Sequence, residues 1–383
     1  MSENHQDKPN RHADPFRFWH LRFWYGMRLS TWLALLKRNR FSVAPGRLGL
    51  ALSTTGFAIA NSVLRAIQEL VFYRAIRRAT VCKSPIFVLG HWRSGTTLLH
   101  EVMVLDERHS YANTYQCMAP NHFLLTSWLV TKLPFLLPRK RPMDAMNAGW
   151  NKPQEDEFAL ANLGQPSPYL SIAFPNGNNA EGTLSLEGLS EQQRAGWKDT
   201  LMWFLRRVSL HSDKTIVIKS PTHTARVKTL LEMFPDAKFV LVVRDPYEVY
   251  LSALKLWTAL RQSQSLQTSD NHDLKNQVLD DFETMFKAFE RDRNLIPEKH
   301  LFETRFEDFI DNPAGEMERL YNELGLGGFE RSRPAVEDYF ARRADYQRDV
   351  YMPRPELREE IDRRWGPYMR RYGYKSPERA GTS

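Results

Sequence analysis

The stretch VLGHWRSGTTLL, residues 88–99, decides the fold of this 383-residue chain. It begins inside the apolar run PIFVLG at 85–90, which is typical of a buried parallel strand, and it leads into a run at 97–105 with helical spacing. A glycine-bounded loop between such a strand and helix turns backbone N–H groups toward one point, where the helix dipole also favours an anion. The stretch therefore predicts a phosphate-binding loop, with an ordinary strand-to-helix turn as the alternative.

The loop departs from the P-loop of nucleotide kinases at one position. That pattern is G-x-x-x-x-G-K-[ST], whereas residues 90–97 read GHWRSGTT, with a threonine where the lysine stands. The turn instead offers one cation and three hydroxyls. The candidate phosphate-binding residues are Gly90, Arg93, Ser94, Gly95, Thr96 and Thr97.

Three further apolar runs, at 215–219, 238–243 and 300–306, have the character of buried strands. Segments of helical periodicity at 225–234 and 276–292 lie between them. This alternation predicts a three-layer α/β fold of the P-loop-like type, with a central parallel sheet flanked by helices. Ligands of such folds gather at the carboxyl ends of the strands.

Positive charge is concentrated near the start of the chain. The net charge is +8, and residues 1–80 carry thirteen Lys and Arg against four Asp and Glu, a balance of +9. This distribution argues against a nucleic-acid partner and for a local contact with something anionic, such as lipid head groups.

Residues 14–44 predict a basic, aromatic-rich helix, with Trp19, Phe23 and Met27 at helical spacing. Such a helix could lie at a membrane surface, which would put residues 14–80 in contact with lipid, or it could pack its apolar face on the rest of the chain. The uncharged run at 48–64 is too short and too polar to predict a membrane span.

Cysteine usage points to a reducing compartment. The chain has two cysteines, Cys82 and Cys117, which form neither a disulfide framework nor a CxxC metal pair. The first fifteen residues are polar and do not predict a signal peptide. We expect a cytoplasmic protein, with a peripheral position at the membrane as an open alternative.

The strand at 238–243 ends in a cation. The segment KFVLVVRDPYEVYLSAL at 238–254 places Arg244 where a nucleotide kinase has the acid that helps to hold Mg²⁺. Arginine in the loop and at this strand end suits a nucleotide that bears extra phosphates and is bound without a metal.

These two motifs, about 150 residues apart, resemble those of the 3′-phosphoadenosine 5′-phosphosulfate (PAPS)-dependent sulfotransferases, of the broad bacterial type related to tyrosylprotein sulfotransferases. The likeness covers about residues 85–330. RSGTTLL at 93–99 is similar to the family's loop around the 5′-phosphosulfate. The resemblance implies that Arg244 and Ser252, eight residues apart, hold the 3′-phosphate.

Two lesser resemblances add candidates. TIVIKSPTH at 215–223 is similar to the segment whose lysine, here Lys219, approaches the sulfuryl group. The stretch at 303–326 is similar to one that places an aromatic ring, here Phe306, near the adenine, although this ring could equally belong to the core. The chain departs from the cytosolic branch by having Arg93 in place of lysine and by lacking the late RKG loop, and the GEE acid of the tyrosylprotein branch is not evident.

The resemblance implies metal-independent, in-line transfer of a sulfuryl group from PAPS to a hydroxyl or amine. Cations must then meet the charge that grows on the leaving phosphate, and Arg93 and Lys219 are the candidates. For the general base our first candidate is His223, followed closely by Glu155 and Asp156 of the acidic run QEDEF at 154–158. A histidine at a helix start or on the surface and a solvated acidic face are the ordinary alternatives, and His91 and His100 rank lower.

The acceptor is expected to be a small-molecule or lipid-like hydroxyl compound. The apolar run at 123–137 could cover such an acceptor, touch a membrane or form a core helix. We expect residues 1–80 to form a helical N-terminal segment and residues 81–383 to form the α/β domain, with acceptor-side loops around 110–200 and a helical C-terminal tail. The competing functions are a P-loop kinase or NTPase and a non-catalytic peripheral membrane module, and the oligomeric state stays open.

Overall fold

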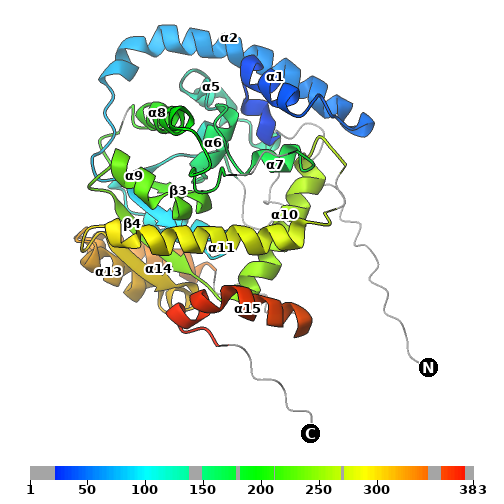
Figure 1. The fold of residues 1–383 in the computed structure, drawn as a ribbon. Helices are drawn as coiled ribbons and strands as arrows, with labels where there is room; N and C mark the ends of the chain where they lie inside the picture. The colour runs from blue at the N-terminus through cyan, green and yellow to red at the C-terminus, as the bar shows by residue number, and fades with distance from the viewer. Residues whose placement is uncertain are drawn as a thin grey trace.

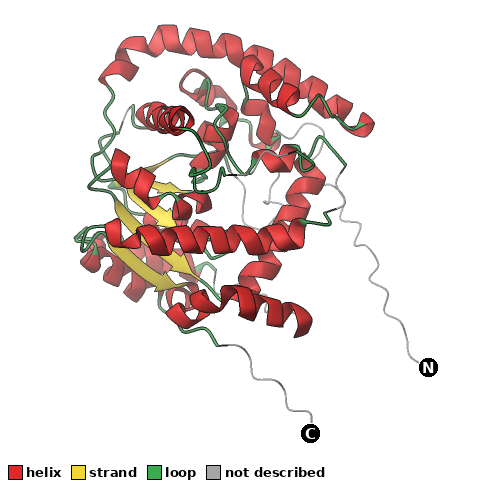
Figure 2. Ribbon diagram, viewed as in Figure 1, coloured by secondary structure: helices red, strands yellow, loops and turns green. Residues whose placement is uncertain are grey.

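The computed structural model describes residues 22–137, 149–177, 182–210, 212–268, 271–343 and 355–375. Within them, five strands form one sheet in the order β2-β3-β1-β4-β5, and every neighbouring pair is parallel (Figures 1 and 2). The strands are β1 (Ile86–Leu89), β2 (His109–Tyr111), β3 (Thr215–Lys219), β4 (Lys238–Val243) and β5 (Leu301–Arg305). The predicted α/β fold with a parallel sheet is confirmed, and β2 is the strand that the sequence did not predict.

Helices cover both faces of the sheet, because alternate residues of a strand point to opposite sides. Phe87 and Leu89 of β1 belong to one apolar cluster, and Ile86 and Val88 belong to the other. The first cluster includes α8 (Glu191–Val208), α9 (Val227–Met233), α10 (Pro246–Gln264), α11 (Leu274–Asp292) and α15 (Pro355–Tyr372). The second includes α3 (Thr96–Met103), α12 (Phe306–Asp311), α13 (Pro313–Glu323) and α14 (Arg333–Ala341).

Shorter helices fill the segment between β2 and β3 and the connections elsewhere. The α-helices are α4 (Thr114–Met118), α5 (Phe123–Val130), α6 (Asp156–Asn162) and α7 (Leu170–Ala173). The 3₁₀ turns are η1 (Phe23–Gly26), η2 (Pro45–Arg47), η3 (Pro134–Leu136), η4 (Pro221–Ala225), η5 (Arg293–Leu295) and η6 (Phe329–Arg331). The described residues from 149 to the start of α8 form loops and short helices.

The N-terminal aromatic segment packs inside the molecule. Instead of the single helix predicted at 14–44, residues 23–38 form η1 and α1 (Leu29–Arg38), while Trp19 lies outside the described residues. The helical conformation is interrupted after Gly26, which packs so closely that a Cβ there would lie 2.1 Å from the carbonyl oxygen of Met118. The rings of Phe23 and Trp24 are buried in the first cluster, so for this part the alternative of packing on the rest of the chain is the one observed.

A single long helix, α2 (Leu48–Arg78), follows and runs along the edge of the molecule (Figure 1). It contains the uncharged run at 48–64, which alone is too short to span a membrane, and continues to Arg78. Residues 45–78 are long and apolar enough to cross a membrane by length and composition, and 17% of their most apolar window is buried. Core helices of soluble proteins meet the same criteria of length and composition, but they are mostly buried.

The loop between β1 and α3 needs glycine at both ends. Gly90 has φ 141° and Gly95 has φ 101°, a region that side chains with a Cβ rarely adopt. A Cβ at Gly90 would lie 2.5 Å from the carbonyl oxygen of Val242, and one at Gly95 would lie 2.2 Å from the ring of Phe306. The loop therefore lies so close to β4 and α12 that only glycine fits at these two positions.

We expect Gly95→Ala to destabilise the fold more than Gly325→Ala. Both glycines have positive φ, but nothing lies within 4 Å of a Cβ at Gly325, whereas the ring of Phe306 blocks one at Gly95. Gly325→Ala should therefore cost about 1–2 kcal/mol for the left-handed backbone alone, and Gly95→Ala about 1–3 kcal/mol more for the overlap. Urea unfolding measures both, and equal losses would contradict the tight packing of this loop.

Candidate active site

Three neighbouring strands bring the predicted site residues to one edge of the sheet. β3, β1 and β4 are adjacent and parallel, so their carboxyl ends meet. Lys219 ends β3, the loop at 90–95 follows β1, and Arg244 follows β4. The loop therefore lies between a lysine on one side and an arginine on the other.

The loop is held in shape by its own polar groups. The backbone N–H of Gly90 donates to Oγ1 of Thr224 at 2.8 Å, and the hydroxyl of Ser94 donates to the carbonyl of His91 at 2.8 Å. Arg93 has φ 73°, a strained conformation for a residue with a side chain. The Ser94 hydroxyl thus stabilises the loop itself, which the sequence did not distinguish from a direct phosphate contact.

On the β4 side, the two predicted phosphate-binding residues and the loop arginine lie together. Nε of Arg93 donates to Oγ of Ser252 at 2.8 Å, and a terminal nitrogen of Arg244 donates to the carbonyl of Arg93 at 3.1 Å. Arg244 also donates to one carboxylate oxygen of Glu248, at 3.0 and 2.6 Å. Its guanidinium lies 4.4 Å from the ring centre of Phe306, which is itself buried in the second cluster.

Tyr368 fixes the backbone of Arg244 from outside every motif. Its hydroxyl accepts from the Arg244 N–H at 2.9 Å and donates to the Arg244 carbonyl at 2.8 Å. Burial holds the pKa of Tyr368 well above its ordinary value, so the phenol keeps its proton. The hydroxyl comes from α15, near the end of the chain, and no sequence signal marks it.

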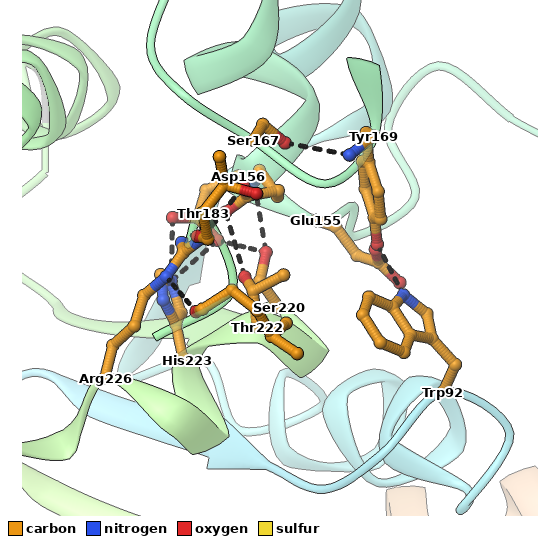
Figure 3. Close-up of polar contacts among 12 residues, drawn as sticks. Trp92, Glu155, Asp156, Ser167, Tyr169, Thr183, Ser220, Thr222, His223 and Arg226 are labelled. Carbon is orange, nitrogen blue, oxygen red and sulfur yellow. Dashed lines mark hydrogen bonds and ion pairs between the residues drawn. The ribbon is translucent and has the colours of Figure 1, made fainter. Parts of the chain in front are cut away.

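On the β3 side, Lys219 and Glu155 form a buried ion pair beside the loop. Nζ of Lys219 lies 2.7 Å from Oε1 of Glu155 and donates to Oγ1 of Thr97 at 3.3 Å. The other carboxylate oxygen of Glu155 accepts from the hydroxyl of Tyr169, which in turn accepts from Nε1 of Trp92 at 2.8 Å (Figure 3). Burial, with the charge of Glu155, raises the pKa of Tyr169 well above its usual value, so it remains the donor.

The acidic run is buried and paired, so the alternative of a solvated face is wrong. Asp156 lies 2.9 Å from Nε2 of His223, and Glu157 lies 2.6 Å from a terminal nitrogen of Arg226, with all four side chains almost fully inaccessible (Figure 3). Together with the Glu155–Lys219 pair, three consecutive carboxylates meet three partners at the end of β3 and just beyond it. These pairs attach α6 to the end of the sheet.

The contacts of Asp156 keep its carboxyl group ionised although it is buried. Burial raises the pKa of a carboxyl group, but the contacts of Asp156 with His223 and Ser220 bring its pKa below the ordinary value. The Ser220 hydroxyl donates to it at 2.7 Å. Asp156 is therefore an ionised acceptor in the folded protein.

The three candidate histidines are enclosed. His223 lies edge-on between Phe87 and Trp197, is fully buried, and directs Nε2 to Asp156. Burial lowers the pKa of His91 to about 4 and that of His100 to about 3, so both imidazoles are neutral near pH 7. Among the residues that the structure describes, no group of three or more His, Cys, Asp or Glu forms a candidate metal site.

Sequence reasoning missed the aromatic groups that orient these charges. Trp92 lies inside the quoted loop but was not assigned a role, and Tyr169 lies in a segment without a motif. Tyr169 lies 14 residues from Glu155 in the sequence, and Trp92, which donates to Tyr169, lies 77 residues from Tyr169. Only the fold brings them together.

Comparison with known proteins identifies the family. The family model of the sulfotransferase family matches residues 85–331. The chain belongs to the sulfotransferase family. It is also similar, at 41% identity over 360 residues, to the omega-hydroxy-beta-dihydromenaquinone-9 sulfotransferase Stf3 of Mycobacterium bovis and of Mycobacterium tuberculosis, an alignment that covers 94% of this chain and 93% of each relative.

Solved structures of sulfotransferases have the same fold. STF9 from Mycobacterium avium aligns with a TM-score of 0.69 at 17% identity, over 92% of this chain and 98% of that chain. STF1 from Mycobacterium tuberculosis aligns with a TM-score of 0.56 at 16% identity, over 81% and 85%. The resemblance stated from the two motifs is thus confirmed, and this chain is a sulfotransferase rather than a kinase.

We expect Glu157→Gln to destabilise this sulfotransferase by about 3–5 kcal/mol, because it leaves the charge of the buried Arg226 without its partner. The matched control is Glu232→Gln, which removes a carboxylate from an exposed pair with Lys198 and should cost less than about 1 kcal/mol. Urea unfolding monitored by circular dichroism measures both. Similar small losses for the two variants would contradict the structural role of the Glu157–Arg226 pair.

Proposed function

We propose that this sulfotransferase moves a sulfuryl group from PAPS to the hydroxyl of a lipid-like acceptor without a metal ion. The observation that carries the proposal is the division of charge around the loop. An arginine cluster with Ser252 lies on the β4 side, and a lysine with a buried carboxylate lies on the β3 side. A donor with a phosphate at each end of its ribose matches two cationic positions on either side of a loop of backbone amides.

For the donor, we assign the 3′-phosphate to Arg244 and Ser252, and we add Arg93 because its side chain already lies on Ser252. The 5′-phosphosulfate then occupies the loop, near Thr97 and Lys219. The sequence analysis expected Arg93 to meet the charge on the leaving phosphate, and it noted that the late RKG loop is absent from this chain. The position of the Arg93 side chain supports a contact to the 3′-phosphate instead.

For the chemical step, Glu155 is better situated as the base than His223. One oxygen of Glu155 is next to Lys219 and the other accepts from Tyr169, so the carboxylate is oriented beside the loop. His223 is enclosed and directs Nε2 at Asp156. We therefore assign His223 and Asp156 to positioning α6 against β3.

In the proposed reaction the acceptor oxygen attacks the sulfur in line with the bond to the 5′-phosphate. The acceptor proton passes to Glu155, the new O–S bond forms, and the old S–O bond breaks with its electron pair left on the phosphate. Lys219 offsets the charge that develops on that phosphate oxygen. The products are a sulfate ester and 3′-phosphoadenosine 5′-phosphate.

For the acceptor, the relatives at 41% identity are named for a hydroxylated menaquinone. The outward-facing side chains of α5 and η3 support a similarly apolar acceptor, because Trp128 and Phe135 are more than half exposed near the acceptor-side loops. We propose a cytoplasmic location at a membrane, which is consistent with Cys82 and Cys117 both being unbridged.

We expect 3′-phosphoadenosine 5′-phosphate to raise the melting temperature of the protein more than ADP or ATP does, with or without Mg²⁺. A ligand at about 100 times its Kd stabilises the folded state by about 2.7 kcal/mol. Arg244→Ala and Ser252→Ala should lose most of this shift. The control Arg342→Ala removes an exposed arginine directly after α14 and should keep it. An equal or larger shift with Mg-ATP would contradict the proposed donor.

We expect Glu155→Gln to lower kcat for sulfuryl transfer by about 100-fold or more while the thermal shift by the nucleotide is retained, because the variant cannot take the acceptor's proton. Tyr169→Phe should lower kcat less and shift the pH–rate profile, because Glu155 loses one hydrogen bond. His223→Ala serves as the comparison, with an effect mainly on stability. A normal kcat in Glu155→Gln would rule out its role as base.

A further inference from the structure

Helix α2 has its polar side turned toward the protein. Asn61 donates to the carbonyls of Tyr25 and Met27 at 2.6 and 2.8 Å. Gln68 donates to the carbonyl of Asn121 at 3.2 Å and accepts from the N–H of Leu124 at 2.9 Å. These side chains are buried, so the helix is attached to the rest of the molecule through hydrogen bonds.

The charged groups in the middle of α2 also face the protein. Arg65 donates to the side chain of Asn121 at 2.9 Å and lies 4.6 Å from the ring centre of Trp203. Glu69 lies 2.7 Å from a terminal nitrogen of Arg207, which is almost fully buried. Neither charge is available to make the outer side of the helix soluble.

The outer side of α2 is apolar along most of its length. From residue 48 to residue 73, every exposed position is hydrophobic, glycine or alanine. We call its large side chains the α2 face: Leu48, Leu52, Phe57, Ile59, Val63, Ile67, Leu70, Val71 and Tyr73. The neighbouring helix α5, which packs against α2, adds Trp128 at 66% exposure.

This pattern is the reverse of an ordinary surface helix, which turns its apolar stripe inward. A helix of 31 residues is about 46 Å long, and the exposed large apolar side chains of the α2 face run along most of it. Exposed apolar side chains gathered in one patch mark an interaction site. In water such a face is unfavourable. In contact with an apolar phase such as lipid, the same face is favourable.

Three exposed arginines follow the α2 face at the end of the helix, at positions 74, 77 and 78. Residues 1–80 carry a net charge of +9. An anionic surface complements both features, because apolar side chains can enter the acyl region while the arginines stay among the head groups. A second copy of the chain would present the same positive charge instead.

We propose that the α2 face binds the surface of an anionic lipid membrane, with the helix lying in the membrane plane. Crossing the bilayer would strip Asn61, Gln68 and Glu69 of their partners in the protein, and unpaired polar groups are costly in hydrocarbon. The proposal rests on the proposed function, since it explains how a lipid-like hydroxyl acceptor is met. Within residues 14–80, for which the sequence allows a lipid contact, the proposal assigns that contact to the α2 face, because the aromatic residues Phe23, Trp24 and Trp32 are buried in the protein.

The first test is binding of the full chain to vesicles in a sedimentation assay. We expect binding to vesicles of equal parts phosphatidylcholine and phosphatidylglycerol, and weaker binding to phosphatidylcholine alone. Leu52→Glu combined with Leu70→Glu should weaken binding about 100-fold, because two leucines no longer enter the membrane. The control is Leu295→Glu, at an exposed leucine of η5 outside the α2 face, which should bind like the wild type. Unchanged binding of the double variant would overturn the proposal.

Two further measurements separate the possible failures. The double variant should keep its thermal shift by 3′-phosphoadenosine 5′-phosphate and its transfer rate to a short, water-soluble alcohol. If the wild-type protein binds vesicles but shows no thermal shift with 3′-phosphoadenosine 5′-phosphate, the result would count against the proposed function alone. The lipid proposal would be overturned if the wild-type protein is a dimer, the double variant is a monomer, and neither binds vesicles. A second copy of the chain would then be what covers the α2 face.

If the double variant does not fold, tryptophan quenching provides the test without altering α2. Brominated lipids should quench the emission of the wild-type protein, and Trp128→Phe should remove a measurable part of that quenching. Equal quenching in the two proteins would show that this surface stays out of the membrane. That result would overturn the proposal.

Discussion

The pairing of three buried carboxylates with three groups at the end of β3 and just beyond it is the constraint on which this site depends. A buried charge is tolerated only when a partner and hydrogen bonds replace water. Glu155, Asp156 and Glu157 therefore require Lys219, His223 and Arg226, and the reverse also holds. The consequence is geometric, because α6 and the acceptor-side segment around it can lie only where all three pairs form together.

The three pairs differ in how they can respond to a ligand. Asp156 and Glu157 have their oxygens occupied by side chains that are themselves enclosed, so any change there leaves a buried charge alone. The pair of Glu155 and Lys219 instead borders the phosphate loop through Thr97. Two pairs hold the scaffold, and in the proposed reaction the third pair exchanges its partners for a phosphate and an acceptor hydroxyl.

The sequence could predict the sheet and the loop because both depend on local patterns. Buried parallel strands are short apolar runs, and Gly90 and Gly95 mark the loop they lead into. β2 was missed because its residues, HSY, carry no apolar run and become a strand only by pairing with β3. The partners of the acidic run and the hydroxyl of Tyr368 were missed for the same reason, since contacts across 64 to 124 residues leave no local pattern. Tyr169 contacts Glu155 across 14 residues, but no motif marks its segment.

Helix α2 shows why composition does not determine which surface meets a partner. Aromatic and aliphatic residues near the N-terminus are equally apolar, yet Trp24 and Trp32 fill the core while Leu52 and Leu70 face outward. The difference comes from the polar residues between them. Asn61 and Gln68 find partners only on the protein side, so they fix the rotation of the helix and leave its aliphatic residues outside. A few buried amides thus decide which side of an apolar helix is exposed.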